Sequence, residues 1–489
     1  MKALFLIAFL IPFMLPAQPI PLAQKLHDAH ATYRETTLTQ RRFKHKDVQA
    51  LLDKRRDNPL YEITKVGESF EGRDINMVKV GHGPHKALLW TQMHGDEPTA
   101  TMAIFDILNF LENKNDDFDA LRTQLLDSLT LYIVPMLNPD GAERYQRRTA
   151  QGIDMNRDAL YLQTPEGRIL KELQQTLQPE FGFNLHDQSP RYSAGRSGNV
   201  ATISFLATAY DYDRNINEVR EKSMKMIVRM NRLLQTFIPG QVGRYNDEHE
   251  PRAFGDNVQK WGTTLILIES GGYQGDPEKQ YIRQLNFVAI LSGLAAVADG
   301  TLANETRDDY YLIPENERYL YDLLVRNATV KRGAKSYQAD FGINRNEVNY
   351  ANASKFFYQG KIEDYGDLST HYGSEEINAD GYTLERGKVY PTTLKSISDA
   401  AKLNPVELWK QGYTYLRVAN TSSRSLGLYY TVQPFHILRS APTPTGSPDM
   451  GDAATFLLKK DGKVRYAVVN GFVFDTEKAF ARKGNGLVE

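Results

Sequence analysis

The sequence predicts an α/β protein, with a mixed sheet that carries helices on both faces, followed by a C-terminal β-sandwich. Between residues 58 and 300, short apolar runs that fit buried strands alternate with segments of helical periodicity. After Gly300 the segments become short, rich in Tyr, Val and Thr, and broken by Gly, Asn and Asp, which indicates strands and turns. We therefore expect an α/β domain over residues 58–305 and a sandwich domain over residues 318–489.

The first residues have the pattern of an export signal. A lysine is followed by an apolar run, residues 3–15, and then by the small residue Ala17 at a plausible cleavage site. The run is too short to span a bilayer, which takes about 20 residues. A buried first helix is the alternative interpretation. We predict a signal peptide over residues 1–17, a helical lead-in over residues 18–57, and a secreted or periplasmic protein.

Apolar periodicity and turn residues place the individual elements. Buried-type apolar runs predict strands at residues 61–66, 75–80, 87–90, 131–134, 181–185 and 264–268. Apolar residues at helix-face spacing predict helices at residues 99–111, 224–237 and 281–297. In the C-terminal region, β-like segments lie at residues 323–330, 337–343 and 464–474.

Composition and charge exclude several classes of protein. The chain has 59 Lys and Arg residues against 60 Asp and Glu residues, so its formal net charge is −1. A nucleic-acid binder or a protein of anionic membranes needs a basic surface, so we expect neither kind of binding. We also expect no membrane insertion, because no stretch after the export signal is long and apolar enough to be transmembrane. The chain contains no cysteine, which excludes disulfides, thiolate metal sites and cysteine nucleophiles. Any metal must therefore bind to His, Asp and Glu.

Three residues of these types follow predicted strands of the sheet. His94 and Glu97 come after the strand at residues 87–90, and His186 ends the run Phe181–His186. Ligands of α/β sheets bind in the crevice outside the carboxyl ends of the strands. Each residue alone is weak evidence, because an exposed loop residue or a structural histidine would have the same sequence pattern. Together, two histidines and one carboxylate form a zinc ligand set that leaves a fourth position for water.

Glu269 carries the strongest individual signal. It ends a run of four aliphatic residues and is followed by Ser270 and two glycines. A carboxyl group in such a partly desolvated place has a raised pKa, in the range useful to a general base.

Donor groups follow the strand at residues 131–134. Arg147, Arg148, Asn156 and Arg157 supply cationic and amide donors there. A hydrolase that attacks a carbonyl needs such donors for the developing oxyanion, and an arginine fork suits a carboxylate.

The order and spacing of these motifs resemble the M14 zinc carboxypeptidase family, in an exported bacterial branch. The resemblance rests on five motifs: His-x-x-Glu at residues 94–97, Asn-Pro-Asp-Gly at 138–141, Gly-x-Asp-x-Asn-Arg at 152–157, His186, and Glu-Ser-Gly-Gly at 269–272. The resemblance covers about half of the chain, and it implies that one zinc ion is bound by His94, Glu97 and His186.

The same resemblance implies roles for the remaining candidates. Glu269 would be the general base, and Arg147, with Arg148 as the alternative, would polarise the scissile carbonyl. The terminal carboxylate of the substrate would be held by Asn156 and Arg157. Asp154 would accept the other ring N–H of His94.

Three positions depart from the best-known members of the family. Tyr245 is a loose match to their mobile tyrosine, and Asp96 stands where they have a basic residue. Asp256, in the stretch before the base, either favours a cationic substrate side chain or is structural. These departures concern the substrate, and the hydrolytic chemistry is unaffected by them.

Short segments after residue 318 resemble the β-sandwich of amidohydrolase-superfamily enzymes, without their metal-bearing barrel. A generic packing module is the alternative. From all of this we expect an exported zinc-dependent metallocarboxypeptidase whose substrate is a peptide with a free C-terminal carboxylate. The alternatives are a cell-wall (murein) peptide amidase using the same site, a deacylase acting on acylated amino acids, and a non-catalytic peptide- or glycan-binding module.

Overall fold

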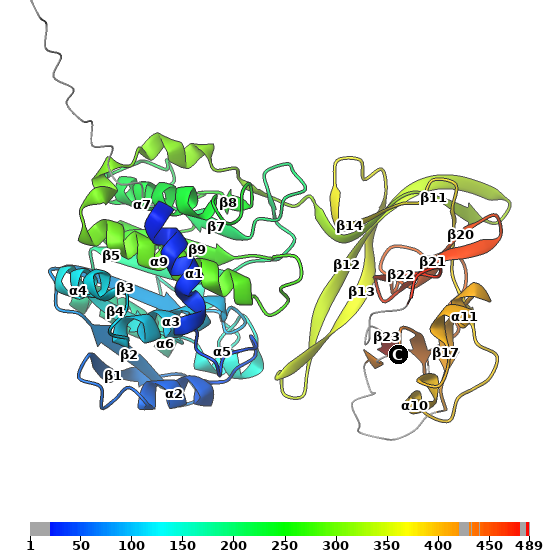
Figure 1. Cartoon of the computed structure of the whole chain (residues 1–489), viewed down its shortest axis with the longest axis horizontal. Coiled ribbons are helices and arrows are strands. Elements are labelled where there is room, and N and C mark those ends of the chain that lie inside the picture. The colour runs from blue at the N-terminus through cyan, green and yellow to red at the C-terminus, as the bar shows by residue number, and fades with distance from the viewer. Residues whose placement is uncertain (1–19, 420–429, 432, 440, 480–485, 489) are drawn as a thin grey trace, which may run out of the picture.

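The computed structural model describes residues 20–419, 430–431, 433–439, 441–479 and 486–488. The predicted signal peptide lies outside these residues. Two parts are visible side by side in Figure 1: an α/β part built on one large sheet, and a strand-rich C-terminal part. The predicted helical lead-in contains α1 (Ile20–Tyr33) and α2 (His45–Asp53).

The α/β part is built on a mixed sheet of eight strands, in the order β1-β2-β4-β3-β5-β9-β7-β8. The strands are β1 (Tyr61–Glu68), β2 (Asp74–Val80), β3 (His85–Thr91), β4 (Leu129–Val134), β5 (Phe181–Asp187), β7 (Ile203–Leu206), β8 (Val242–Arg244) and β9 (Thr264–Ser270). β4, β3, β5 and β9 run parallel to one another, whereas β2 and β7 are antiparallel to their neighbours β4 and β9. The parallel strands therefore end at one common edge.

Helices cover both faces of this sheet, which confirms the predicted fold class. One core contains side chains of α1, α3 (Thr99–Glu112), α4 (Asp119–Ser128), α7 (Glu218–Leu234) and α9 (Gln280–Ala298). A second core on the opposite face contains side chains of α6 (Pro165–Leu177) and α8 (Phe254–Lys260). Successive strand residues alternate between the two cores: Leu89 faces the first core, whereas Leu88 and Trp90 face the second.

Helix α9 is apolar all round because it lies inside the first core. By length and composition alone it would be long enough to cross a membrane, yet most of its residues are buried within the protein. It contacts α1, α3, α4 and α7. A helix that is hydrophobic on every side and covered by neighbouring helices is the pattern of a core helix.

Two sheets form the C-terminal part. The first contains β11 (Leu320–Arg332), β12 (Lys335–Tyr350), β13 (Lys355–Gly366), β14 (Tyr372–Asn378), β15 (Thr383–Glu385), β20 (Phe456–Lys460), β21 (Lys463–Val469) and β22 (Phe472–Asp475). The second contains β16 (Lys388–Val389), β17 (Tyr413–Arg417), β18 (Tyr430–Thr431), β19 (His436–Leu438) and β23 (Gly486–Val488). Side chains of both sheets and of α11 (Pro405–Lys410) meet in one core.

The segment at residues 464–474 is a hairpin instead of one β-like run. Strands β21 and β22 pair antiparallel around Asn470 and Gly471. Both residues have positive φ, 52° and 76°, which an Asn-Gly pair adopts readily in a tight hairpin turn.

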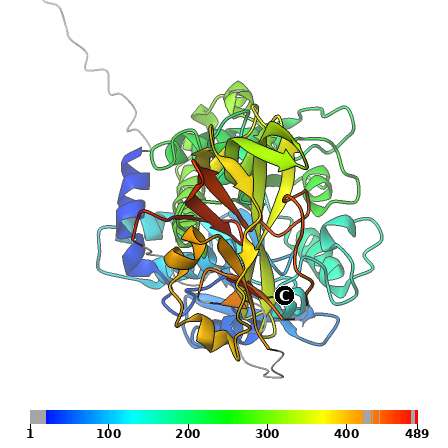
Figure 2. The ribbon, with the colours of Figure 1, turned by 90° about the vertical axis from the view of Figure 1, so that its right-hand side faces the viewer.

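The two parts of the chain touch on two sides. On one side β6 (Ser193–Ala194), in the loop after β5, pairs with β10 (Asn316–Glu317). On the other side the far end of β12 and β13 reaches α5 (Pro139–Arg144) (Figure 1). In the view of Figure 2 the C-terminal sheets lie in front of the α/β part.

Candidate metal centre

Three neighbouring strands of the sheet deliver the candidate site. His94 and Glu97 lie in the loop after β3, and β3 pairs with β5. His186 on β5 stands opposite Glu269 on β9 in the parallel register. Because residues opposite each other in a parallel pair point to the same face, these two side chains lie side by side. The structure thus brings together four residues from three segments that are far apart in the chain.

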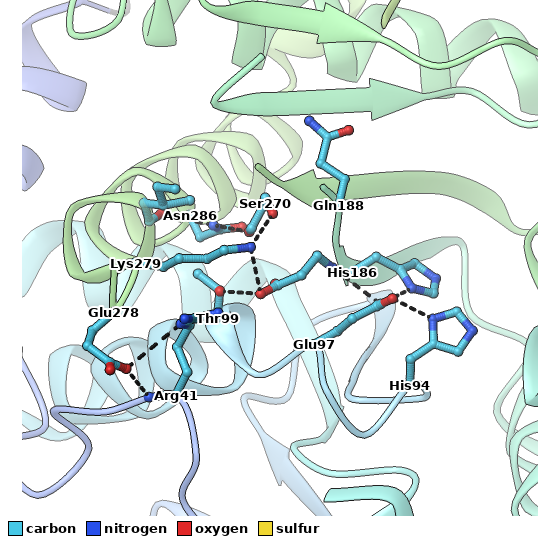
Figure 3. Close-up of polar contacts among 12 residues, drawn as sticks. Arg41, His94, Glu97, Thr99, His186, Gln188, Ser270, Glu278, Lys279 and Asn286 are labelled. Atoms are coloured by element: carbon cyan, nitrogen blue, oxygen red, sulfur yellow. Dashed lines mark hydrogen bonds and ion pairs between the residues drawn. The ribbon is translucent and has the colours of Figure 1, made fainter. Parts of the chain in front are cut away.

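His94, Glu97 and His186 form a buried group that could hold a metal ion (Figure 3). Nδ1 of His94 lies 2.8 Å from Oε1 of Glu97, and Nδ1 of His186 lies 2.6 Å from Oε2. One donor atom from each residue falls within 4.8 Å of the others. Ligand atoms at tetrahedral positions about 2.0–2.1 Å from zinc would be about 3.3 Å apart. The donor set and its spacing therefore fit a zinc ion after small adjustments.

Electrostatics in this group are set by its own carboxylate. Burial favours neutral groups, yet the two imidazoles hold the pKa of Glu97 below its ordinary value. Burial likewise disfavours the imidazolium of His94, but Glu97 and Asp154 outweigh it and raise the pKa of His94 to about 9. A metal ligand must be deprotonated, so metal binding to His94 would displace a proton.

Asp154 fixes the orientation of the first histidine. Nε2 of His94 donates to Oδ1 of Asp154 over 3.1 Å, which leaves Nδ1 facing Glu97. The same carboxylate accepts the backbone N–H of Asn156 and Nε of Arg147. A carboxylate behind a metal-ligating imidazole sets its tautomer and strengthens it as a ligand.

Arg147 lies beside the ligands and remains accessible to solvent. Its Nη1 donates to Oε1 of Glu97 over 3.1 Å, and 45% of its side chain is exposed. Arg148, the alternative, donates to the carbonyl of Gly152 at the surface. The geometry therefore favours Arg147 as the cation next to a substrate carbonyl.

Glu269 faces the same space. Within the described part of the chain, its Oε2 is buried and makes no hydrogen bond. Burial, and next the charge of Glu97, raise its pKa well above the ordinary value. An uncommitted carboxylate oxygen beside His186 is placed to exchange a proton with a water molecule at the site.

Tyr245 follows β8 and lies near Glu269. Its ring packs edge-on against Tyr192, with centroids 5.7 Å apart. Burial, then the nearby charge of Glu269 and the contact with Tyr192, raise the pKa of its hydroxyl. The phenol therefore stays protonated and can donate a hydrogen bond towards the site. Tyr192, which lies in the loop after β5, was not among the residues predicted for the site.

Asn156 and Arg157 lie on the short 3₁₀ helix Met155–Arg157. Oδ1 of Asn156 accepts the backbone N–H of Phe254, which ties this turn to the start of α8. Arg157 keeps 38% of its side chain exposed, and its Nε lies 3.4 Å from Glu250. A substrate carboxylate would have to compete with this acid.

Asp256 is committed to its own loop. It accepts the backbone N–H of Glu250 and lies 3.2 Å from Nδ1 of His249. Burial raises its pKa to about 6. These contacts match the structural interpretation of this residue.

A buried ion pair behind the ligands was not found from the sequence. Asp187 donates its backbone N–H to Oε2 of Glu97, and its carboxylate accepts Thr99 Oγ1 and lies 3.1 Å from Lys279 Nζ. Figure 3 shows Lys279 and Thr99 converging there. Asp187 could have been predicted from the sequence because it directly follows the candidate ligand His186. Lys279 could not, because it lies 92 residues away from Asp187 in the chain.

Comparison with known proteins finds similarity to zinc carboxypeptidases in the part of the chain that carries the ligands. The family model described as zinc carboxypeptidase matches residues 48–188. Carboxypeptidase 2 of Trichophyton tonsurans is 30% identical over 152 residues, which cover 30% of this chain and 27% of that protein. Carboxypeptidase E of Caenorhabditis elegans is 31% identical over 145 residues, covering 26% of this chain and 29% of that one.

Residues 48–188, which include the three candidate ligands, are therefore similar to the M14 zinc carboxypeptidase family. The chain spans little more than a quarter of the length of the two curated relatives. Among solved structures, a metallo-carboxypeptidase from Burkholderia cenocepacia matches with 16% identity and a TM-score of 0.43, over 53% of this chain and 70% of that one. The family match ends at residue 188, so it includes the three ligands but not Glu269 or the C-terminal sheets.

Proposed function

We propose that this protein is an exported, zinc-dependent metallocarboxypeptidase that removes residues from peptides with a free C-terminal carboxylate. One observation carries the proposal: a buried His-Glu-His group faces an uncommitted glutamate and an accessible arginine. The match to the zinc carboxypeptidase family supports zinc as the metal. Export to the periplasm or the medium rests on the pattern of residues 1–17.

Different residues of the site would perform the separate steps of peptide hydrolysis. Bound zinc would supply Lewis acidity, which polarises a carbonyl and acidifies water. Oε2 of Glu269 takes a proton from the attacking water, whose oxygen adds to the scissile carbonyl carbon. Glu269 then returns this proton to the nitrogen as the C–N bond breaks, which yields an amine and a carboxylic acid that loses its remaining proton to solvent at neutral pH. Arg147 stabilises the negative charge that develops on the carbonyl oxygen.

The turn beside α8 would bind the C-terminal carboxylate of the substrate. Asn156 and Arg157 offer an amide and a guanidinium, which suit the two oxygens of a carboxylate. Tyr245, close to Glu269, offers a protonated hydroxyl as a further donor. The predicted substrate is therefore a peptide whose last carboxylate is free.

Matched peptides test this proposal. The zinc-loaded protein is incubated with peptides that differ only in a free or an amidated C-terminus, and the products are identified by mass spectrometry. We expect loss of single C-terminal residues from the free peptides and no cleavage of the amidated ones. If the protein cleaved only murein peptides, it would be a cell-wall amidase. If it cleaved only acylated amino acids, it would be a deacylase. Binding of zinc and peptide without any turnover would leave only a binding module.

A further inference from the structure

The far end of the β12–β13 hairpin is built into the α/β part next to the site. Glu347 on β12 pairs with Arg41 and Arg42 in the loop between α1 and α2, at 2.5 and 2.8 Å. Asn349 on the same strand accepts Nε of Arg42 over 3.0 Å. These contacts join residues more than 300 positions apart in the chain.

Glu347 compensates two buried cations at once. The side chains of Arg41 and Arg42 are 8% and 3% exposed, whereas that of Glu347 is 26% exposed. Burial would raise the pKa of Glu347, but the two guanidiniums outweigh it and hold this pKa below its ordinary value. Without this carboxylate, two adjacent buried guanidiniums would repel each other, which is costly in a region of low dielectric constant.

Both arginines contact Tyr145, which stands two residues before Arg147. The Arg42 guanidinium lies between the rings of Tyr145 and Phe356, 4.1 Å from each centroid. Nη1 of Arg41 donates to the Tyr145 hydroxyl over 3.2 Å. Nδ2 of Asn349 donates to the backbone carbonyl of Tyr145, also over 3.2 Å.

The backbone at Tyr145 has a conformation that needs support. Tyr145 is the C-cap of α5 and has φ 48° and ψ 58°, in the left-handed region, which is unfavourable for a residue with a side chain. This bend turns the chain from α5 towards the metal ligands, where Arg147 meets Glu97. Contacts that hold the ring and the carbonyl of Tyr145 therefore determine where the Arg147 guanidinium lies.

Arg41 is anchored independently on the ligand side. Its backbone N–H donates to Glu278 over 2.7 Å (Figure 3). Glu278 precedes Lys279, which forms the ion pair with Asp187 behind the ligands. Loss of Glu347 would thus leave this side of the site in place and act on the Tyr145 side.

We propose that Glu347, from the C-terminal part of the chain, is a positioning residue of the active site: it clamps Arg41 and Arg42 so that they hold the bend at Tyr145 and place Arg147. This inference rests on the proposed function for its catalytic consequence. It gives the C-terminal sheets a role in the hydrolysis, since the β12–β13 hairpin supplies the carboxylate that holds the residues next to Arg147.

The test compares Glu347→Gln with the control Glu363→Gln in the full-length, zinc-loaded protein. Glu363 lies on β13 of the same hairpin, is exposed, and bonds only to Asn346 among its described contacts. In Glu347→Gln we expect kcat to fall about tenfold or more, because a displacement of about 1 Å can cost a hundredfold. KM should change less than about threefold, since Arg147 acts on charge that develops in the transition state. Zinc content and the kinetics of the control should match those of the unmodified protein.

A second pair of variants shows whether Glu347 acts through Arg147. Introduced into Arg147→Ala, the Glu347→Gln change should lower the residual kcat no further. Equal losses of kcat in both backgrounds would mean that Glu347 only stabilises the fold, and would overturn the proposal.

Hydrogen–deuterium exchange of the zinc-free protein provides a readout that does not depend on activity. Amides of residues 142–150 should exchange faster in Glu347→Gln than in Glu363→Gln. Unchanged exchange there would overturn the inference even if peptide hydrolysis is confirmed. Faster exchange in a protein that cleaves no peptide would support the clamp and refute the proposed function. If Glu347→Gln does not fold, Asn349→Ala, which removes the bond to the Tyr145 carbonyl, is measured by the same criteria.

Discussion

Replacement of Glu269 by Gln tests the chemistry of the site most directly. The amide keeps the size and shape of the side chain on β9, so the fold and the His94, Glu97 and His186 ligands should be unaffected. It removes a carboxylate oxygen that is buried and makes no hydrogen bond among the described residues. Both oxygens of Glu97 are bound to imidazoles, so Glu97 is not free to replace the base.

The expected loss follows from this lack of a substitute. A positioned general base contributes about 10² to 10⁴ in rate, which corresponds to about 2.7–5.4 kcal/mol at 1.36 kcal/mol for each factor of ten. Since both oxygens of Glu97 are engaged and Asp187 is paired with Lys279, we expect kcat of Glu269→Gln to fall by about 10³ to 10⁴. Zinc content should stay at about one ion per chain.

The assay follows single-residue release from an unblocked peptide by mass spectrometry, with zinc measured in the same preparations. Glu248→Gln, an exposed position of the preceding loop, is the matched control and should keep full activity. A Glu269→Gln protein that retains its zinc and more than about a tenth of the original kcat would refute the reasoning, because proton transfer would then not pass through this carboxylate.

Three further outcomes follow from buried groups. His186→Ala removes one of three ligands, so zinc per chain should fall from about one to near zero, and full retention of zinc in elemental analysis would contradict the assignment. Burial raises the pKa of Asp256 from 3.8 to about 6, so the stability that its neutral form contributes is present below pH 4 and lost as the pH rises to 6. The unfolding free energy of the unmodified protein, relative to Asp256→Asn, should therefore decrease by up to about 3 kcal/mol over this interval, and a difference independent of pH in urea titrations would refute it. Arg283→Met leaves Asp106 buried without its guanidinium, both side chains being 0% exposed, and should lower the unfolding free energy by about 3–5 kcal/mol; a loss below 1 kcal/mol would exclude this role.

The local elements of the α/β part could be predicted because each carries its own pattern. The apolar runs around Leu89 and Ile266 are buried on both sides, as strands inside a helix-covered sheet must be. The polar residues that end them, such as His186 and Glu269, then fall at one edge because the strands are parallel. Periodicity was less informative at residues 464–474, where the turn at Asn470 and Gly471 divides the segment into a hairpin.

By itself, the sequence determined the class of fold and the candidate ligands, because strand patterns and the side chains that end strands are local properties. Only the tertiary structure decided which charges meet. Lys279 lies against Asp187, and Glu347 of the C-terminal hairpin lies against Arg41 and Arg42. Such pairs depend on how separate layers and loops pack, and no spacing along the chain encodes a contact between residues 300 positions apart.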